Sequence, residues 1–94
     1  MPSKSDWRDR RLSAFTELAQ LVKTENRRQI ALWGVQSHSL FCWLSILGEE
    51  VGEMNKAALK AECDNKSLVG LRDEAIHAAT MALKVAEMAM AHLA

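Results

Sequence analysis

Two pairs of side chains with metal-binding chemistry occur at the same spacing in this chain. Glu50 and Glu53 lie three residues apart, and so do Glu74 and His77. In a helix, residues at this spacing lie one turn apart on nearly the same face. An acid on the buried side of a helix is costly unless a cation or another partner compensates its charge. Two such pairs on neighbouring helices could therefore converge on one cation.

The positions of the acids on their helices are compatible with a cation site and with surface ion pairs. Glu50 and Glu53 interrupt an apolar column of their helix, and Glu74 has Met, Val and Ala side chains along its face. The alternative, an intrahelical pair with Lys or Arg, fits Glu74 poorly. It suits Glu49, which points away from the apolar positions and could pair with Lys56. Mg²⁺ is the expected ion, and Mn²⁺ is possible, because both prefer oxygen ligands and bind phosphates.

Three helices are expected to position these residues. The first should run from about Ser5 to Leu32, and the second roughly from Leu40 to Ala61 with Ser39 as its N-cap. The third should begin at Leu68 or Leu71 and continue nearly to the C-terminus. The segments 33–39 and 63–67 break the helical periodicity and are predicted to be connections.

Apolar stripes predict how the helices pack. The first helix should bury Phe15, Leu18, Val22 and Ile30, and the second should bury Leu40, Leu44, Leu47, Val51, Met54 and Ala58. The third helix is rich in Ala, and its apolar residues cover more than half of its circumference. One partner helix would not cover so wide an arc, so the pattern predicts self-association.

Length and composition agree with an all-α protein that forms one domain over residues 1–94. The chain has no Tyr, one Pro and no β-branched runs, so a sheet is not expected. Twelve basic and twelve acidic residues balance, which argues against a dedicated nucleic-acid binder. Charged residues interrupt both the N-terminal segment and the last helix, so neither a secretory signal nor a membrane span is expected. A cytoplasmic protein with reduced cysteines is the expectation.

Three segments resemble the MazG-like all-α nucleoside triphosphate pyrophosphohydrolases. They read WG-x-Q-x-H at 33–38, LGEEVGE-x-x-x-A at 47–57 and LR-x-E at 71–74. That superfamily carries an E-E-x-x-E block followed, after a short variable stretch, by E-x-x-D. The resemblance extends over about residues 33–88, and its specificity comes from the register of the helix–loop–helix.

The resemblance implies Mg²⁺-dependent hydrolysis of (deoxy)nucleoside triphosphates to the monophosphate and pyrophosphate, a house-cleaning reaction of the nucleotide pool. It implies an N-terminal helix and a helical hairpin that assemble as a homodimer or homotetramer with four-helix-bundle packing. The metal ligands would be Glu50, Glu53, Glu74 and His77, with Glu50 and Glu53 as catalytic residues. His77 stands where the family has Asp, and imidazole suits softer ions than Mg²⁺. It could bind through water, orient another ligand or shift the preference towards Mn²⁺.

Four further residues are candidate substrate contacts. Trp33, Gln36 and His38 precede the metal helix, where members of the family contact the base or sugar. An indole can stack on a base, and Gln or His can read its edge. Lys84 lies near His77 on the third helix and could bind a phosphate. The alternatives are that Trp33 closes the core, His38 caps a helix and Lys84 is solvated.

A different function class remains open at this stage. The chain could be a non-enzymatic helical dimer that acts as a protein- or nucleic-acid-interaction module. The substitution of His77 for the family's Asp and the basic first helix favour that alternative. The three glutamates among apolar residues favour the enzyme, with a nucleoside triphosphate as its substrate.

Overall fold

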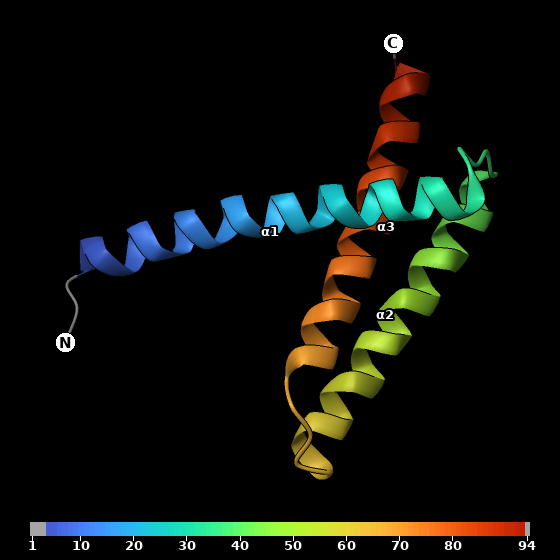
Figure 1. The fold of residues 1–94 in the computed structure, drawn as a ribbon. Coiled ribbons are helices and arrows are strands. Elements are labelled where there is room, and N and C mark those ends of the chain that lie inside the picture. The colour runs from blue at the N-terminus through green and yellow to red at the C-terminus, as the bar shows by residue number, and fades with distance from the viewer. Residues whose placement is uncertain (1–3, 94) are drawn as a thin grey trace.

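Three helices make up the part of the chain that the computed structural model describes, which is residues 4–93 without the side chains of residues 4, 5 and 7. They are α1 (Lys4–Trp33), α2 (Leu40–Cys63) and α3 (Val69–Leu93), with no strand among those residues. Helices α2 and α3 form an antiparallel hairpin, and α1 crosses α3 (Figure 1). The all-α prediction is confirmed, and each of these helix ends lies within two residues of the predicted position.

Local sequence signals fix the connection between α1 and α2. Gly34 adopts a positive φ of 74° and donates its N–H to the carbonyl of Ile30 at 2.8 Å. Glycine is favoured at this position because a Cβ strains the left-handed conformation. Ser39 is extended, and its hydroxyl accepts the N–H of Cys42 at 3.2 Å. The prediction that Ser39 caps the second helix is therefore confirmed.

The turn between α2 and α3 is short and polar. The N–H groups of Asp64 and Lys66 both donate to the carbonyl of Lys60, at 3.0 and 3.3 Å, and so terminate α2. Asn65 takes the left-handed conformation between them, with a φ of 52°. A connection of this length brings the two helices back side by side in opposite directions. This antiparallel arrangement places the middle of α2 against the first half of α3.

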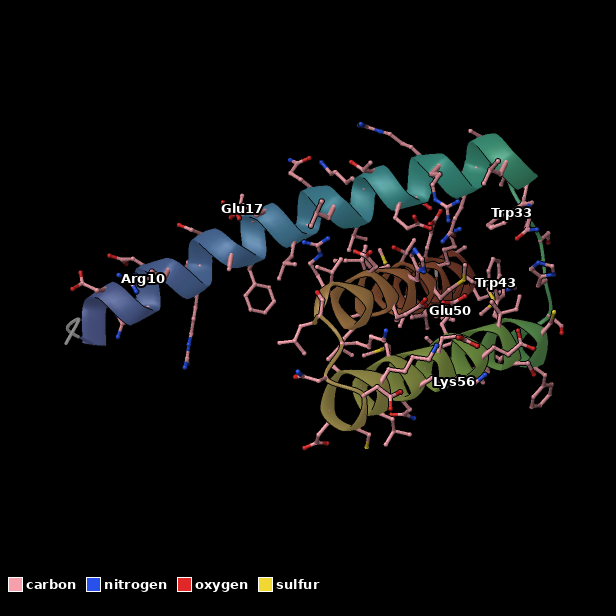
Figure 2. The ribbon with its side chains drawn as sticks, turned by 60° about the horizontal axis from the view of Figure 1, so that its bottom comes forward. Arg10, Glu17, Trp33, Trp43, Glu50 and Lys56 are labelled. Atoms are coloured by element: carbon pink, nitrogen blue, oxygen red, sulfur yellow. The ribbon has the colours of Figure 1, made fainter. Side chains whose placement is uncertain are left out.

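The buried face of α1 is polar, which differs from the predicted apolar stripe. The buried side chains of this helix are Glu25 and Gln29, where α1 packs on α3. Phe15 is 73% exposed because the first half of α1 extends beyond the hairpin (Figure 2). The prediction that Phe15, Leu18 and Ile30 face a core is wrong for this chain taken alone.

The core between α2 and α3 contains Trp43, Ala78 and Met81, with Thr80 beside them. Trp43 belongs to the column of Glu50 and not to the predicted core stripe of α2. From that stripe, Leu40, Leu44 and Val51 stay 44–49% exposed, whereas Leu47, Met54 and Ala58 are half-buried. The hairpin therefore turns the acid-bearing column of α2 towards α3.

The chain is more extended than a compact monomer of its mass. Its radius of gyration is 15.9 Å, against about 12 Å for a compact domain of this length. Its accessible surface is 7498 Å², against about 5,400 Å² expected for a folded monomer of this mass. Many large apolar side chains contribute to that surface. In residues 4–93, no helix is long and apolar enough to cross a membrane.

Candidate metal centre

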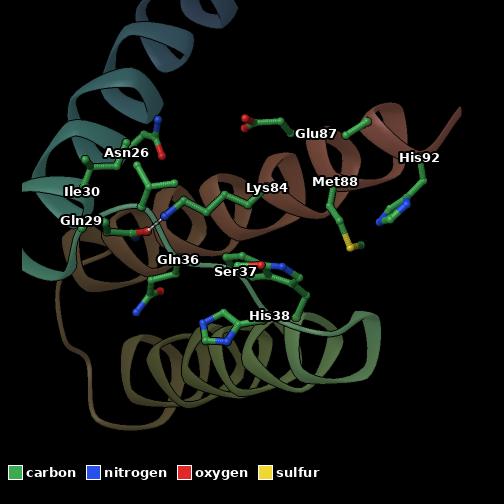
Figure 3. Close-up of a pocket in the computed structure, with 14 residues that line it drawn as sticks. Asn26, Gln29, Ile30, Gln36, Ser37, His38, Lys84, Glu87, Met88 and His92 are labelled. Atoms are coloured by element: carbon green, nitrogen blue, oxygen red, sulfur yellow. Dashed lines mark hydrogen bonds between the residues drawn. The ribbon is translucent and has the colours of Figure 1, made fainter. Parts of the chain in front are cut away.

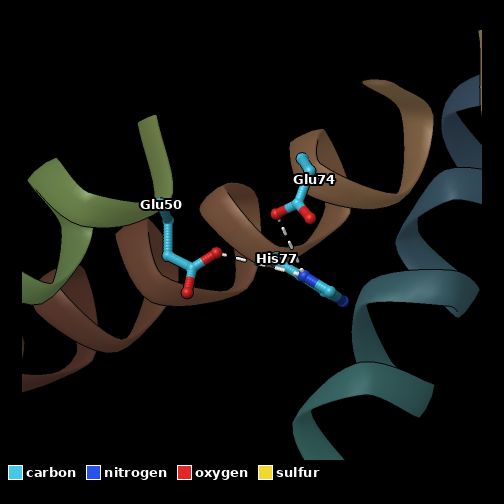
Figure 4. A group of neighbouring side chains, drawn as sticks. All are labelled: Glu50, Glu74 and His77. Carbon is cyan, nitrogen blue, oxygen red and sulfur yellow. Dashed lines mark ion pairs between the residues drawn. The ribbon is translucent and has the colours of Figure 1, made fainter. Parts of the chain in front are cut away.

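Three of the four predicted metal ligands meet between α2 and α3. Glu50 on α2 and Glu74 and His77 on α3 each offer one ligand atom, and these atoms lie within 4.8 Å of one another. The Nδ1 atom of His77 lies 3.5 Å from Oε2 of Glu74 and 4.0 Å from Oε2 of Glu50 (Figure 4). All three side chains are about one-third exposed. Water and a small ligand can therefore reach the cluster.

The donor set fits a divalent cation. Ligand atoms that surround one octahedral ion at about 2.1 Å lie about 3 Å from their neighbours. The observed separations, 3.5 and 4.0 Å from Nδ1 and no more than 4.8 Å within the group, are somewhat longer than this value. Two carboxylates and one imidazole suit Mn²⁺ and related ions, while carboxylates alone suit Mg²⁺ better. Three protein ligands also leave positions open for water and phosphate oxygens.

The electrostatics of the cluster favour a cation as well. Burial raises the pKa of the Glu50 carboxyl, the carboxylates of Glu74, Glu53 and Glu25 raise it further, and His77 lowers it. The ionised form of Glu50 is thus held in an unfavourable environment. A divalent cation would remove that penalty because it neutralises the charges that cause it.

Glu53, the fourth predicted ligand, lies outside this group. Its side chain is half exposed, and Oε1 lies 3.6 Å from Nζ of Lys56. Of the two alternatives for Glu49, a pair with Lys56 or no pair, the structure does not form the first, because Lys56 lies beside Glu53. Glu53 and Glu74 both line a pocket of about 200 Å³ near the turn of the hairpin. The same pocket contains three lysines and a serine, which are Lys56, Lys60, Lys66 and Ser67.

Glu25 on α1 joins the site from the other side of His77. Its carboxylate is 8% exposed and accepts hydrogen bonds from Nε and Nη2 of Arg28 at 2.7 and 2.8 Å and from Nε2 of Gln29 at 2.7 Å. Its Oε1 lies 3.6 Å from Nε2 of His77. The hydrogen bonds from Arg28 lower the pKa of Glu25 against the opposing effect of burial, with smaller contributions from Gln29 and His77. Glu25 is therefore a buried anion.

Sequence reasoning missed Glu25 because its helix has the composition of a basic surface. The available signal was local: Glu25 is followed at three and four residues by Arg28 and Gln29, which can both donate to it. That pattern also occurs on solvated helices. Only the crossing of α1 over α3 makes it part of the site.

A second pocket of about 340 Å³ contains three of the predicted substrate contacts. It lies between the end of α1, the connection 34–38, the start of α2 and the second half of α3, and Gln36, His38 and Lys84 line it (Figure 3). The rings of His38 and Trp43 pack edge to face there, with centroids 4.7 Å apart. Lys84 donates a hydrogen bond to Oε1 of Gln29. Burial lowers the pKa of Lys84, so this lysine is not the freely solvated one of the alternative interpretation.

Trp33 is not among the residues that line this pocket. Its side chain is 56% exposed, and the guanidinium of Arg28 lies 5.9 Å from its ring centroid. The alternative in which Trp33 closes the core is wrong for this chain taken alone. Of the four predicted substrate contacts, the structure thus gathers three and leaves Trp33 on the neighbouring surface.

Comparisons with protein-family models, with curated proteins and with solved structures give no match to this chain. The side chains of the site and the motifs in segments 33–38, 47–57 and 71–74 are therefore the features that bear on function. Those segments supply Glu50 and Glu74 to the cluster with His77, and Gln36 and His38 to the 340 Å³ pocket.

Proposed function

We propose that this protein hydrolyses nucleoside or deoxynucleoside triphosphates to the monophosphate and pyrophosphate, with Mg²⁺ or Mn²⁺ as cofactor, as the MazG-like resemblance implies. The observation that carries the proposal is the meeting of Glu50, Glu74 and His77 on two facing helices. Acid pairs on a solvated surface would not have to point at one another. A role in clearing unwanted nucleotides is the corresponding cellular function.

The chemistry assigns each residue a distinct task. A bound divalent cation supplies charge neutralisation at the phosphates and a more acidic water. Glu50, Glu74 and Nδ1 of His77 would hold it. Water then attacks the α-phosphorus, and the bond from this phosphorus to the bridging oxygen breaks, so that pyrophosphate leaves. Glu53 lies one turn from Glu50 without belonging to the three-residue cluster. It is our candidate for the base that accepts the proton of the attacking water.

The pockets on either side suggest how a nucleotide would lie. The 340 Å³ pocket offers amide and imidazole groups from Gln36 and His38 that can recognise a base or sugar. The exposed indole of Trp33 could stack on a base at its rim. The smaller pocket shares Glu74 with the metal cluster and carries lysines that suit phosphate oxygens. Lys84 would contact the phosphates from the other side.

We propose further that the active form is a homodimer or homotetramer. The chain exposes about 2,000 Å² more surface than a compact monomer of its mass would. That excess is comparable to the surface that a protomer buries in a large obligate interface. Leu40, Leu44 and Val51 form part of it and lie on one face of α2, away from the core. A second copy is the occupant with the matching helical, apolar chemistry.

One assay tests the proposed activity. Pyrophosphate release should be measured over a panel of nucleoside and deoxynucleoside triphosphates with Mg²⁺ and with Mn²⁺. We expect wild-type turnover of at least one substrate and a loss of at least about 100-fold in Glu74→Gln, because the amide keeps the shape and loses the charge that a metal requires. Glu49→Gln is the matched control, since Glu49 is an exposed carboxylate that directly precedes Glu50 in α2. Equal turnover by wild type and Glu74→Gln would contradict the metal assignment.

The extended first half of α1 favours a second candidate, an interaction module. This segment extends beyond the hairpin (Figure 2). It carries Arg8 and Arg11, and its Phe15 is exposed. A projecting helix with basic and apolar side chains can dock on a protein partner. The assay above separates the two functions, because a module would release no pyrophosphate with any substrate or ion.

A further inference from the structure

We propose that Glu25 is a positioning residue for the candidate metal centre, and that it holds His77 from the side opposite Glu50 and Glu74 so that Nδ1 is presented to the cation. This inference rests on the proposed metal site and adds a residue from a third helix to it. Glu25 would not bind the metal. It would act through the imidazole.

The two ring nitrogens of His77 face different groups. Nδ1 lies 3.5 and 4.0 Å from the carboxylates of Glu74 and Glu50, and Nε2 lies 3.6 Å from Oε1 of Glu25. Figure 4 shows the same arrangement: the ring extends from the two glutamates towards α1. The distance to Glu25 is slightly longer than a hydrogen bond. Polar contacts of this kind often shorten when the ligand binds.

Glu25 is itself held in one orientation. Arg28 donates to both of its oxygens and Gln29 donates to Oε2. Gln29 in turn accepts a hydrogen bond from Lys84 on α3. A continuous polar chain therefore runs from Lys84 through Gln29 and Glu25 to His77. Among the described residues, no buried side-chain nitrogen or oxygen is left without a partner.

The contact between Glu25 and His77 is polar and lies in a buried place, which favours a functional role for Glu25. Buried ion pairs contribute little to stability compared with apolar residues of the same size, so packing alone does not explain a buried acid here. A histidine that binds a metal usually donates its second ring N–H to a carboxylate or carbonyl, which fixes the ring and raises its basicity. Glu25 stands at that position relative to His77. A proton on Nε2 would leave the lone pair of Nδ1 free for the ion.

Mn²⁺ affinity tests the inference without depending on turnover. Free Mn²⁺ can be followed by its electron paramagnetic resonance signal at pH 7.5 in wild type, Glu25→Gln and Asp73→Asn. Loss of a carboxylate that orients a ligand typically weakens metal binding 10- to 100-fold, so we expect at least about a tenfold loss in Glu25→Gln. Asp73→Asn is the matched control, because Asp73 is an exposed acid paired with Arg72. It should stay within about twofold of wild type.

A double-mutant cycle shows whether Glu25 acts through His77. In a His77→Ala background the Glu25→Gln substitution should produce no further loss of affinity. A full loss in that background, or an affinity of Glu25→Gln within twofold of wild type, would overturn the inference and leave the metal site intact. A wild type that binds no Mn²⁺ would overturn the metal site together with the inference.

A measurement on the unmodified protein covers the case in which Glu25→Gln fails to fold. Long-range ¹H–¹⁵N spectra of the Mg²⁺-saturated wild type report which ring nitrogen of His77 carries the proton. The inference requires the proton on Nε2, next to Glu25. A proton on Nδ1 would contradict it.

Discussion

Glu50→Gln should have opposite effects on stability in the absence and in the presence of metal. Without metal, the carboxylate of Glu50 stands near those of Glu74, Glu53 and Glu25 in a half-buried place, and its pKa is raised. The amide keeps the size of the side chain and removes the charge. With metal, the same charge becomes a ligand. The metal-free variant should therefore be more stable than wild type, and the metal-loaded variant less stable.

The separation of the carboxylates sets the size of the metal-free effect, and the occupancy of the site by metal sets the size of the other. Two unit charges no more than 4.8 Å apart repel by at least about 3.5 kcal/mol at an effective dielectric constant of about 20. Attraction to His77 and exposure to solvent reduce this repulsion, so we expect a net gain of about 1 kcal/mol, or about 4–8 °C in Tm for a domain of this size. Metal at 100 times its Kd stabilises the native state by about 2.7 kcal/mol. Wild type should therefore gain about 10–20 °C.

Thermal unfolding followed by circular dichroism measures both effects, at one protein concentration in EDTA and in excess Mn²⁺. Glu49→Gln is the control, because it removes an exposed charge from the neighbouring position. It should change stability by less than about 0.5 kcal/mol and keep the full response to metal.

The pH dependence in EDTA gives a further check on the cause. The folded-state pKa of Glu50 is raised, so its ionised form destabilises the fold at pH values above that pKa. As the pH falls towards 4.5, the native state takes up the proton first and the penalty disappears. The advantage of Glu50→Gln should therefore shrink at acid pH. A variant that melts below wild type in EDTA at pH 7, or one that gains as much from Mn²⁺ as wild type, would refute the reasoning.

Two other outcomes are expected. In His77→Asp, Mg²⁺ should support hydrolysis as well as or better than Mn²⁺, because a carboxylate suits the harder ion. Activity of wild type and His77→Asp measured with each ion checks this expectation. Identical metal dependence in wild type and variant would place His77 outside the metal site. Sedimentation equilibrium at low micromolar concentration should show a dimer or tetramer, because Leu40, Leu44 and Val51 form an exposed apolar row on one face of α2. A monomer that still hydrolyses nucleotides would contradict the proposed self-association.

The three helices and the convergence of Glu50, Glu74 and His77 could be predicted from the sequence, because both depend on local signals. Ser39 caps α2 through its own hydroxyl, and Gly34 ends α1 through its own backbone. The short turn after α2 then forces an antiparallel hairpin. Once the hairpin is given, side chains on the faces that the two helices turn towards each other approach one another, whereas Glu53, one turn beyond Glu50, stays half exposed beside Lys56. Glu50, Glu74 and His77 follow from that constraint.

The crossing of α1 over α3 could not be predicted in the same way. The apolar residues of α1 indicated one buried face, yet the helix buries Glu25 and Gln29. The hydrogen bond from Lys84 on α3 to Gln29 on α1 joins residues 55 apart in the sequence. The pattern of residues within α1 does not indicate which residues of α3 they contact. The contribution of Glu25 to the site was therefore visible only in three dimensions.

The proposed self-association would explain both the core-like spacing of the stripe on α2 and its exposure in the structure. Leu40, Leu44 and Val51 recur at core spacing, but α3 covers the neighbouring column that contains Trp43 and Glu50. A helix with two apolar faces needs two partners, and one chain supplies only one of them. A second copy that packs on the stripe would convert the hairpin into a four-helix arrangement and bury the excess surface. The cluster of Glu50, Glu74 and His77 would remain open, because its residues lie on the column that already faces α3.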